Sequence, residues 1–383
     1  MILGIDATNI RSGGGLTHLR EIINFSDINS HGFDKVVIWS SQQTLNLLPN
    51  EEWLVKISHE YLNKSFVWSF LYQVFILGGE ANKHDCSLVF VPGGTFISSF
   101  RPFVTMSQNM LPFELHEAFR FKSFLTRTRF LILRITQSYS FKKAEGVIFL
   151  TKYAHNAISS ILNLKKKPFK IISHGIDKKF SSLPKAPMSP DFYNSTNPFK
   201  LLYVSIVTAY KHQWNVAEAV CKLNERGYPL HLDLIGPKDE EGFSKLKAVL
   251  DRYPNSKSCI SYLGKKDHRD LFDYYRKSDA FVFASSCENL PIILIEAMSA
   301  GLPIASSDRG PMPEVLKDAG YYFNPEDVDS IYKSLEDLYL SYQDRYSIAN
   351  KAYFYTNNFT WANCSTETFD FLAQIAKTTT NEK

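Results

Sequence analysis

Short apolar runs alternate along this chain with longer stretches that suit helices. In the first half the runs are rich in Val, Ile and Phe, and they predict strands at 2–6, 36–40, 88–91, 103–106, 146–150 and 170–173. The same rhythm resumes with predicted strands at 201–207, 230–235, 259–263, 280–284 and 303–306. Apolar strands separated by segments long enough for crossover helices are typical of parallel sheets. The pattern therefore predicts an α/β protein with two doubly wound parallel sheets.

The length of the chain agrees with two domains. Its 383 residues exceed what one hydrophobic core usually supports. Residues 178–198 carry Pro184, Pro187 and Pro190 among many Ser and Asn, which is typical of a linker. We therefore expect one domain at 1–177, a second at 199–356, and a final helix at 357–383 that packs its aromatic side chains. Two such sheets would hold ligands at the carboxyl ends of their strands.

Two carboxylates mark the second domain as the place for chemistry. Glu288 and Glu296 lie eight positions apart in C-E-N-L-P-I-I-L-I-E, directly after the predicted strand 280–284. Glu288 falls in the strand-to-helix turn and Glu296 one to two turns into the helix, while Pro291 suits the first helical turn. Free N–H groups at a helix start favour an anionic ligand. This arrangement suits a sugar attached to a phosphate; the alternative is a capping glutamate followed by a solvated one.

The segment resembles the Glu-x7-Glu motif of the retaining glycosyltransferases of family 4. The stretch from Ser306 to Glu314 resembles the strand and turn that follow in that family, and His174-Gly175-Ile176-Asp177 resembles its signature before the linker. The resemblance implies the GT-B fold: two Rossmann-like domains that face a central cleft, with the last helix crossing back to the N-terminal domain. It also implies a donor-sugar role for Glu288 and a ribose role for Glu296. We expect the donor nucleotide to contact three further residues, Asn289, Leu290 and Ile292.

A basic residue is expected near the donor phosphates. Lys211 follows the predicted strand 201–207 and precedes a helix that starts near Trp214, so its ammonium can neutralise charge on the leaving group. Many family members carry an Arg a few residues earlier, where this chain has Val207 or Thr208. His212 is a speculative substitute for that missing cation. The alternative for Lys211 is an ordinary solvated loop lysine.

Two groups in the first domain resemble the acceptor side of the family. Gly13, Gly14 and Gly15 follow the first strand and precede a helix, where glycines let the backbone approach a ligand closely. The spacing is that of no nucleotide fingerprint, so a plain flexible turn is the alternative. Gln108 and Asn109 stand where many members have His-Asp. Their amides hydrogen-bond sugar hydroxyls but cannot act as a general base.

No metal or other cofactor is expected besides the nucleoside-diphosphate sugar itself, because no Asp-x-Asp in a metal-binding context and no His/Cys ligand cluster occurs. The five cysteines are scattered without a C-x-x-C pair, which favours reduced thiols. The chain start lacks the basic lead of a signal peptide and no apolar run is long enough to span a bilayer, so we expect a cytoplasmic protein.

The charge of the chain is uneven. Residues 1–180 carry 21 Lys and Arg against 13 Asp and Glu, although the whole chain has a net charge of only +4. Residues 118–144 hold seven cations and no acid among many Phe, Leu and Ile. On one helix Arg120, Arg127 and Arg134 would form a stripe, with Lys122 and Arg129 opposite. This segment predicts contact with anionic lipid at the inner membrane, the alternative being a core helix with snorkelling cations.

The most specific hypothesis is a retaining, metal-independent hexosyltransferase that uses a nucleotide sugar and a lipid-linked oligosaccharide, in O-antigen or surface-polysaccharide synthesis. A GT-B sugar-nucleotide epimerase is the enzymatic alternative. A non-catalytic sugar-nucleotide-binding subunit is the alternative from another class, suggested by the missing Arg and His-Asp. Nucleic acid is not an expected partner, because the aromatic residues do not alternate with Arg and Lys in a recognisable module.

Overall fold

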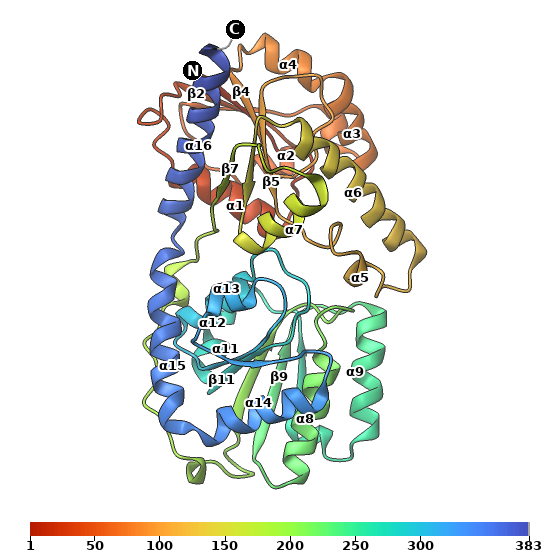
Figure 1. Ribbon diagram of the computed structural model, residues 1–383, viewed down its shortest axis with the longest axis vertical. Helices are drawn as coiled ribbons and strands as arrows, with labels where there is room; N and C mark the ends of the chain where they lie inside the picture. Colours follow the sequence, from red (N-terminus) through yellow and green to blue (C-terminus); the bar gives the residue numbers. More distant parts are fainter. Residues whose placement is uncertain (382–383) are drawn as a thin grey trace. The chain divides into compact units, whose positions relative to one another are not determined.

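The computed structural model describes residues 1–381, and its contacts divide the chain into two units (Figure 1). Unit 1 comprises Met1–Phe113, Thr128–Gly175 and the residues from Phe359 onward, and unit 2 comprises Glu114–Arg127 and Ile176–Asn358. The chain thus passes between the units several times.

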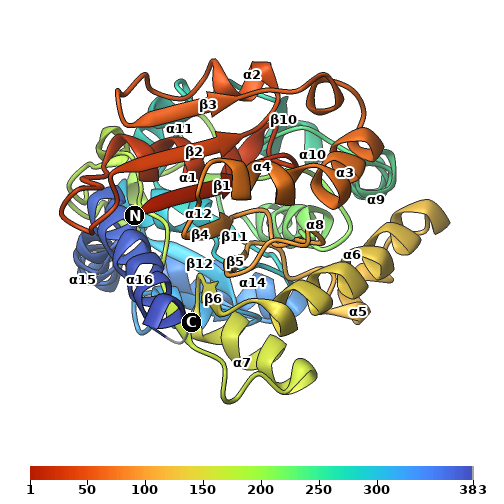
Figure 2. The same cartoon turned by 90° about the horizontal axis from the view of Figure 1, so that it is seen from above.

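Unit 1 is built on a seven-stranded sheet whose strands are all parallel, in the order β3-β2-β1-β4-β5-β6-β7 (Figure 2). The strands are β1 Ile2–Asp6, β2 Lys35–Trp39, β3 Leu54–Ile57, β4 Leu88–Val91, β5 Phe103–Ser107, β6 Gly146–Phe149 and β7 Phe169–Ile171. The helices are α1 Gly13–Asn24, α2 Gln42–Leu45, α3 Phe66–Phe75, α4 Leu77–Lys83, α6 Phe124–Lys143, whose first residues belong to unit 2, α7 Lys152–Leu162 and α16 Trp361–Asn381. A 3-10 turn, η1, covers Glu60–Asn63. Strands β1, β4 and β6 are apolar and buried, which places the core along the centre of this sheet.

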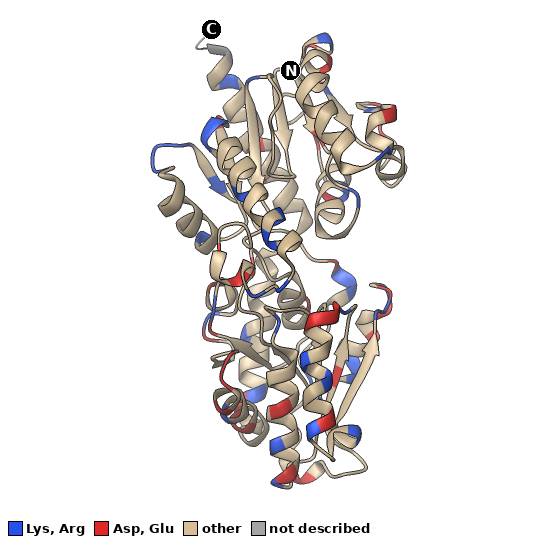
Figure 3. Cartoon of the chain, turned by 90° about the vertical axis from the view of Figure 1, so that its right-hand side faces the viewer, with Lys and Arg blue, Asp and Glu red and all other residues tan. Residues whose placement is uncertain are grey.

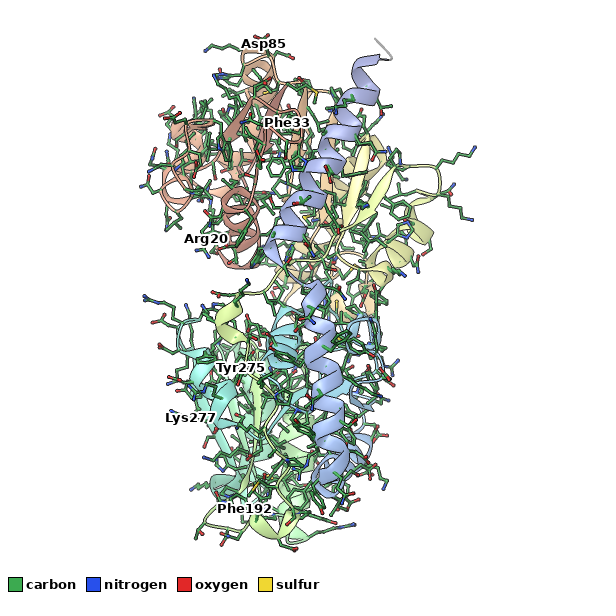
Figure 4. All side chains as sticks on the ribbon, turned by 90° about the vertical axis from the view of Figure 1, so that its left-hand side faces the viewer. Arg20, Phe33, Asp85, Phe192, Tyr275 and Lys277 are labelled. Atoms are coloured by element: carbon green, nitrogen blue, oxygen red, sulfur yellow. The ribbon has the colours of Figure 1, made fainter. Side chains whose placement is uncertain are left out.

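Helix α16 packs against unit 1, as predicted for the last helix. Ser365 Oγ donates to the carbonyl of Ile22 in α1 at 2.7 Å. Phe369 packs edge-on against Phe33, with ring centroids 6.4 Å apart, and Figure 4 shows the labelled Phe33 beside this helix. A side chain on Gly175 would collide with the backbone of Trp361, so the chain approach there requires glycine.

Unit 2 is built on a six-stranded parallel sheet in the order β10-β9-β8-β11-β12-β13. The strands are β8 Phe199–Val204, β9 Leu230–Ile235, β10 Ile260–Gly264, β11 Ala280–Phe283, β12 Ile304–Ser307 and β13 Tyr321–Phe323. The helices are α5 Leu115–Ala118, α8 Gln213–Glu225, α9 Glu240–Arg252, α10 Ser256–Cys259, α11 Leu271–Lys277, α12 Ile292–Ser299, α13 Met312–Leu316, α14 Val328–Leu340 and α15 Tyr342–Tyr355. Three 3-10 turns complete the unit: η2 Lys178–Phe180, η3 Pro190–Phe192 and η4 Thr356–Asn358.

In both sheets the first strand lies in the interior, and the order in which later strands are added reverses beside it. This strand order confirms the predicted doubly wound α/β architecture. The reversal falls between β1 and β4 in unit 1 and between β8 and β11 in unit 2. In such sheets the loops at the carboxyl ends diverge at this point and leave room for a ligand. In unit 2 those loops are the ones that carry Lys211 and Glu288.

The segment 114–127 departs from the predicted division. The sequence places it in the first domain, whereas its contacts group it with unit 2. The cause is a set of hydrogen bonds and ion pairs from Glu117, Arg120 and Lys122 to residues of unit 2.

The basic segment 118–144 is not one helix, contrary to the simplest expectation. Helix α6 begins at Phe124, so Arg120 and Lys122 precede it. Arg127 donates to the carbonyls of Phe119 and Phe121, and Arg134 donates to those of Pro112 and Phe113. Both guanidinium groups are therefore bound to backbone carbonyls of the protein. The predicted stripe of three arginines therefore does not project outward. Within residues 1–381, no helix is both long enough and apolar enough to cross a membrane.

Candidate functional site

The loops after β8 and β11 bring together two predicted catalytic residues. Lys211 Nζ donates to Glu288 Oε1, and the two side chains are only 7% and 16% exposed. The ammonium also lies 5.1 Å from the ring centroids of both Tyr210 and Phe283. Buried charges are stable only when paired. The lysine is thus held beside one carboxylate and two aromatic rings, at the point where the strand order of the sheet reverses.

Tyr203 of β8 fixes these two loops relative to each other. Its hydroxyl donates to the carbonyl of Lys211 at 2.5 Å and accepts from the N–H of Ala284 at 3.2 Å. Burial in the first place, and then the charge of Glu288, raises the pKa of Tyr203 well above its ordinary value. The phenol therefore keeps its proton and remains a donor.

Glu296 lies in α12 with its side chain only 5% exposed, and both of its carboxylate oxygens are engaged. His268 Nε2 lies 2.9 Å from Oε1, and the Tyr275 hydroxyl, labelled in Figure 4, donates to Oε2 at 3.1 Å. Burial, and then the charge of Glu296, raises the pKa of Tyr275 well above its ordinary value. Each carboxylate oxygen retains a further lone pair that can accept from a ribose hydroxyl.

A buried polar chain runs beside the Lys211 and Glu288 pair. Ser286 Oγ donates to Glu117 Oε2 at 2.6 Å, and His212 Nε2 lies 2.9 Å from the same Ser286 oxygen. Ser286 Oγ also lies 3.2 Å from the carbonyl of Tyr210, a longer contact. Since both of these oxygens can only accept the one hydroxyl proton of Ser286, His212 must carry its proton on Nε2 and donate it to Ser286. The order is therefore His212 to Ser286 to Glu117.

The surroundings of Glu117 and His212 decide whether these two side chains are charged. Burial raises the pKa of Glu117, but hydrogen bonds from Arg120 and Ser286 outweigh it, so the pKa lies below the ordinary value. Burial, and then the charge of Arg120, lowers the pKa of His212 to about 4. His212 is therefore neutral near pH 7, which argues against it as the substitute for the missing arginine.

The segment 114–127 covers the loops that carry these residues. Arg120 pairs with Glu117 at 2.8 Å and with Glu326 at 2.7 Å. The ring of Phe121 lies 6.2 Å from that of Tyr210, and the N–H of Lys122 donates to Glu241 at 2.9 Å. A segment from the middle of unit 1's sequence thus contributes a buried carboxylate next to the candidate donor site.

The remaining predicted donor residues surround the start of α12. Asn289 and Leu290 are buried, and Ile292, the first residue of the helix, is half-buried. Pro291 stands at the N-cap position instead of inside the first turn, and its carbonyl accepts from Leu294 and Ile295. The helix start is thus adjacent in sequence to Glu288.

The structure brings two of the predicted groups of unit 1 together. A side-chain carbon on Gly15 would lie 3.4 Å from Oε1 of Gln108, at the carboxyl ends of β1 and β5. The three glycines form the first turn of α1 instead of a separate loop, and Gly13 has a φ of +70° that favours glycine. Around Gly13 and Gly14 there is open space. Asn109 Oδ1 accepts from the N–H of Leu111, which shapes the turn after β5.

Comparison with known proteins identifies the segment that carries the acidic pair. Residues 188–354 match the family model described as glycosyl transferases group 1. We refer to this matched segment as the group 1 domain. The group 1 domain includes Lys211, Glu288 and Glu296 and forms most of unit 2.

Curated relatives are similar in sequence to part of this chain, and a solved structure shares its fold. The chain is similar to the sulfoquinovosyl transferase SQD2 of Arabidopsis thaliana, with 27% identity over 37% of this chain and 32% of that protein. It is also similar to the O-antigen chain mannosyltransferase B of Escherichia coli, with 32% identity over 29% of each. The matched segments thus span about a third of these two relatives. The fold is that of a sucrose-phosphate synthase from Thermosynechococcus elongatus, with a TM-score of 0.74, 14% identity and full coverage of both chains.

Several residues of this site were not predicted from the sequence. Glu117, His268 and Tyr275 reach the two predicted glutamates or their loops from other segments of the chain, and Ser286 lies in the loop of Glu288 itself. Ser286 alone carried a signal, since it directly precedes Cys287 and Glu288. Among residues 1–381, no group of three or more His, Cys, Asp or Glu is placed to hold a metal ion, and the absence of a metal from the reaction stays a prediction.

Proposed function

We propose that this chain is a retaining glycosyltransferase of family 4. It moves a hexose-type sugar from a nucleoside-diphosphate sugar to an undecaprenyl-diphosphate-linked oligosaccharide, in O-antigen or surface-polysaccharide synthesis. The observation that carries the proposal is the buried ion pair of Lys211 and Glu288 at the reversal point of the group 1 domain's sheet. The names of curated relatives, among them an O-antigen chain mannosyltransferase and amylovoran biosynthesis glycosyltransferases, support the substrate class.

The chemistry asks for a cation where the diphosphate leaves. As the bond between sugar C1 and the phosphate oxygen breaks, positive charge develops on the sugar and negative charge on the diphosphate. Lys211 is the cation paired with Glu288 at this sheet edge, and removal of a preorganised group of this kind costs about 10²–10³ in kcat. When a phosphate enters, the ammonium exchanges part of its contact with Glu288 for phosphate oxygens, which leaves the carboxylate oriented for sugar hydroxyls.

The nucleotide and the acceptor proton have separate partners. Glu296 binds the ribose, held in place by His268 and Tyr275. Gln108 and Asn109 bind sugar hydroxyls but cannot ionise. The acceptor proton therefore passes to the leaving phosphate on the same face of the sugar, and no metal takes part.

The lipid-linked acceptor requires access to a membrane. We place the protein at the cytoplasmic face of the inner membrane, in peripheral contact through the basic segment 118–144. The exposed cations of this segment support the contact: Lys122, Arg129, Lys142 and Lys143. Each cation near an anionic surface contributes about 1 kcal/mol. Figure 3 faces the side on which α6 lies and shows Lys and Arg but no acidic residue along that helix.

The test is a donor screen followed by a transfer assay. GDP-, UDP- and dTDP-sugars are screened for binding, and a binding donor is then incubated with an isolated lipid-linked acceptor. The proposal expects nucleoside diphosphate release that depends on the acceptor, and a product linkage with the anomeric configuration of the donor. Lys211→Met and Glu288→Gln should abolish most of this activity. Lys277→Met and Glu225→Gln, which change exposed residues of the same unit, should not.

Other outcomes identify the alternatives. Isomerisation or hydrolysis of the donor without acceptor would indicate a sugar-nucleotide epimerase. Binding of a nucleotide sugar without turnover, over a panel of acceptors, would indicate a non-catalytic binding subunit. An inverted product linkage would refute the retaining mechanism while leaving the transfer itself in place.

A further inference from the structure

Helix α3 has its polar and apolar faces reversed relative to a normal surface helix. Its buried residues are Ser69, Tyr72 and Gln73, whereas Phe66, Val67 and Phe75 are 60%, 64% and 77% exposed. A surface helix in water normally presents its apolar stripe to the core and its polar face to solvent. The exposed face of α3 therefore suits an apolar surrounding.

The polar face of α3 is firmly anchored. Gln73 Nε2 donates to the buried carboxylate of Asp6 at the end of β1 and to the carbonyl of Thr95, and Gln73 Oε1 accepts from the N–H of Ile97. Ser69 Oγ accepts from Arg11 at 3.0 Å. Because these bonds fix the rotation of the helix, the apolar side chains cannot turn inward without breaking buried polar contacts.

The part of α6 that belongs to unit 1 shows a partial reversal. Its buried face combines Gln137 and Ser140 with two phenylalanines, Phe130 and Phe141, while Ile132, Ile135 and Tyr139 are 55%, 70% and 44% exposed. Ser140 Oγ accepts from the N–H of Phe96 at 2.8 Å. Both helices are therefore attached to one loop, 95–97, and expose apolar side chains.

The charged residues within 61–79 and 118–144 are all cations, with Glu60 and Glu80 standing just outside the first of these stretches. No acidic residue occurs at 61–79 or at 118–144, and the exposed cations of α6 in unit 1 are Arg129, Lys142 and Lys143. Exposed apolar side chains near Lys and Arg are typical of surfaces that insert into the interface of an anionic bilayer.

We propose that α3 and α6 form one membrane-inserting surface, the α3/α6 surface, made of Phe66, Val67, Phe75, Ile132, Ile135 and Tyr139. The inference deepens the peripheral membrane contact in the proposed function and adds α3, a helix without charged residues, as its second element. Apolar insertion, with the cations adding attraction to anionic lipid, holds the protein on the membrane. It does not require that the transfer reaction be correct.

A second copy of the chain is a poorer occupant of this surface. A symmetric contact would bring Arg129, Lys142 and Lys143 near their counterparts, and 118–144 offers no carboxylate to compensate them. Like charges brought together at an interface cost stability. An anionic lipid surface supplies the missing negative charge.

The experiment is flotation of the full chain with vesicles of phosphatidylcholine and phosphatidylglycerol, without donor sugar. Phe66→Ser with Phe75→Ser should lower the partition coefficient by about tenfold per side chain, from the apolar area lost. Ile132→Ser with Ile135→Ser should have a comparable effect. Because all four side chains are largely exposed, neither variant leaves a cavity. Phe354→Ser changes a phenylalanine that is 67% exposed on α15 of unit 2 and is the matched control.

Salt and fluorescence separate insertion from attraction by charge alone. At about 0.5 M salt, screening weakens attraction between exposed charges, and the apolar substitutions should still reduce the binding that remains. Trp68 of α3 is 39% exposed, so lipids brominated on the acyl chain should quench it in the wild type and not in Trp68→Phe.

Three results would overturn the inference. The first is unchanged flotation of the Phe66 and Phe75 variant, or an equal loss for Phe354→Ser. The second is the absence of Trp68 quenching in vesicle-bound wild type, which needs no variant to fold. The third is a dimer by sedimentation that the same substitutions dissociate, since that would make a second copy the occupant. Donor binding is measured separately, so a failure here leaves the glycosyltransferase proposal intact.

Discussion

The ion pair of Lys211 and Glu288 gives the sharpest test of the proposed site, through a double-mutant cycle. Removing one partner leaves a largely buried charge uncompensated, because the two side chains are only 7% and 16% exposed. We expect Lys211→Met and Glu288→Gln each to lower the free energy of unfolding by about 3 kcal/mol. In the double variant both charges are gone, so its loss should fall short of the sum by at least about 2 kcal/mol.

The double variant should regain part of the lost stability without regaining activity. If the ammonium stabilises the leaving diphosphate, Lys211→Met lowers kcat by about 10²–10³, and the double variant stays as inactive as Lys211→Met although it is more stable than the sum predicts. Stability is measured by urea denaturation, and activity by acceptor-dependent release of nucleoside diphosphate at saturating donor.

Recovery of activity together with stability in the double variant would show that the pair is only structural, and would refute the assigned role of Lys211. Single variants that unfold like the wild type would refute the buried geometry itself. Lys277→Met and Glu225→Gln are the controls and should change stability by no more than about 0.5 kcal/mol, because both residues are exposed. Figure 4 shows Lys277 at the surface of unit 2.

Three further predictions concern other parts of the chain. Glu117→Gln should cost about 1.5–3 kcal/mol and raise hydrogen exchange in 114–127; because the folded pKa of Glu117 is lowered from 4.5, its stabilisation is present above pH 4.5 and is lost as the pH falls below that value. Burial lowers the pKa of His174 from 6.5 to about 3, so the free energy of unfolding of unit 1 should fall by about 2 kcal/mol between pH 6.5 and 4.5, since only the unfolded chain takes up the proton there. His174→Asn should remove that part of the pH dependence in urea denaturation, and an unchanged profile would contradict it. Tyr275→Phe should raise KM for the nucleotide sugar about fivefold with kcat unchanged, because Glu296 loses one hydrogen bond before and during the reaction; a fall in kcat alone would count against a ribose-binding role.

The central strands and the edge strands β7 and β10 could be predicted from the sequence, whereas the edge strands β3 and β13 could not. Strands β1, β4 and β9 were predicted to the residue, because β1 and β4 are largely apolar runs and β9 alternates buried apolar residues with His231 and Asp233. The short edge strands β3 and β13 are only partly buried, so Lys56 and two tyrosines interrupt the apolar pattern. The predicted strand 201–207 ends at Val204 in the structure, where the chain turns away and exposes Ile206.

Part of the candidate site could be predicted from the strand pattern, and part depends on contacts between residues far apart in the sequence. Lys211 and Glu288 could be expected near each other because each follows a strand of one parallel sheet, and such strands end at one edge. The contact between Glu117 and Ser286 joins residues 169 positions apart, and no periodicity in the sequence encodes it. Glu117 is the last acid before the long basic stretch, but that pattern indicated a charged surface and not a buried hydrogen bond.

Residues 114–127 pack with unit 2 although unit 1 precedes and follows them in the sequence, and this affects the design of fragments and chimeras of this protein. The segment lies outside the group 1 domain at 188–354, yet it supplies the carboxylate that Ser286 donates to and the arginine that pairs with Glu326. A fragment cut at 176–358 would expose Ser286 and His212 to water beside the donor loops. Chimeras that exchange carboxyl-terminal halves between related transferases should therefore carry this stretch along with the half it serves.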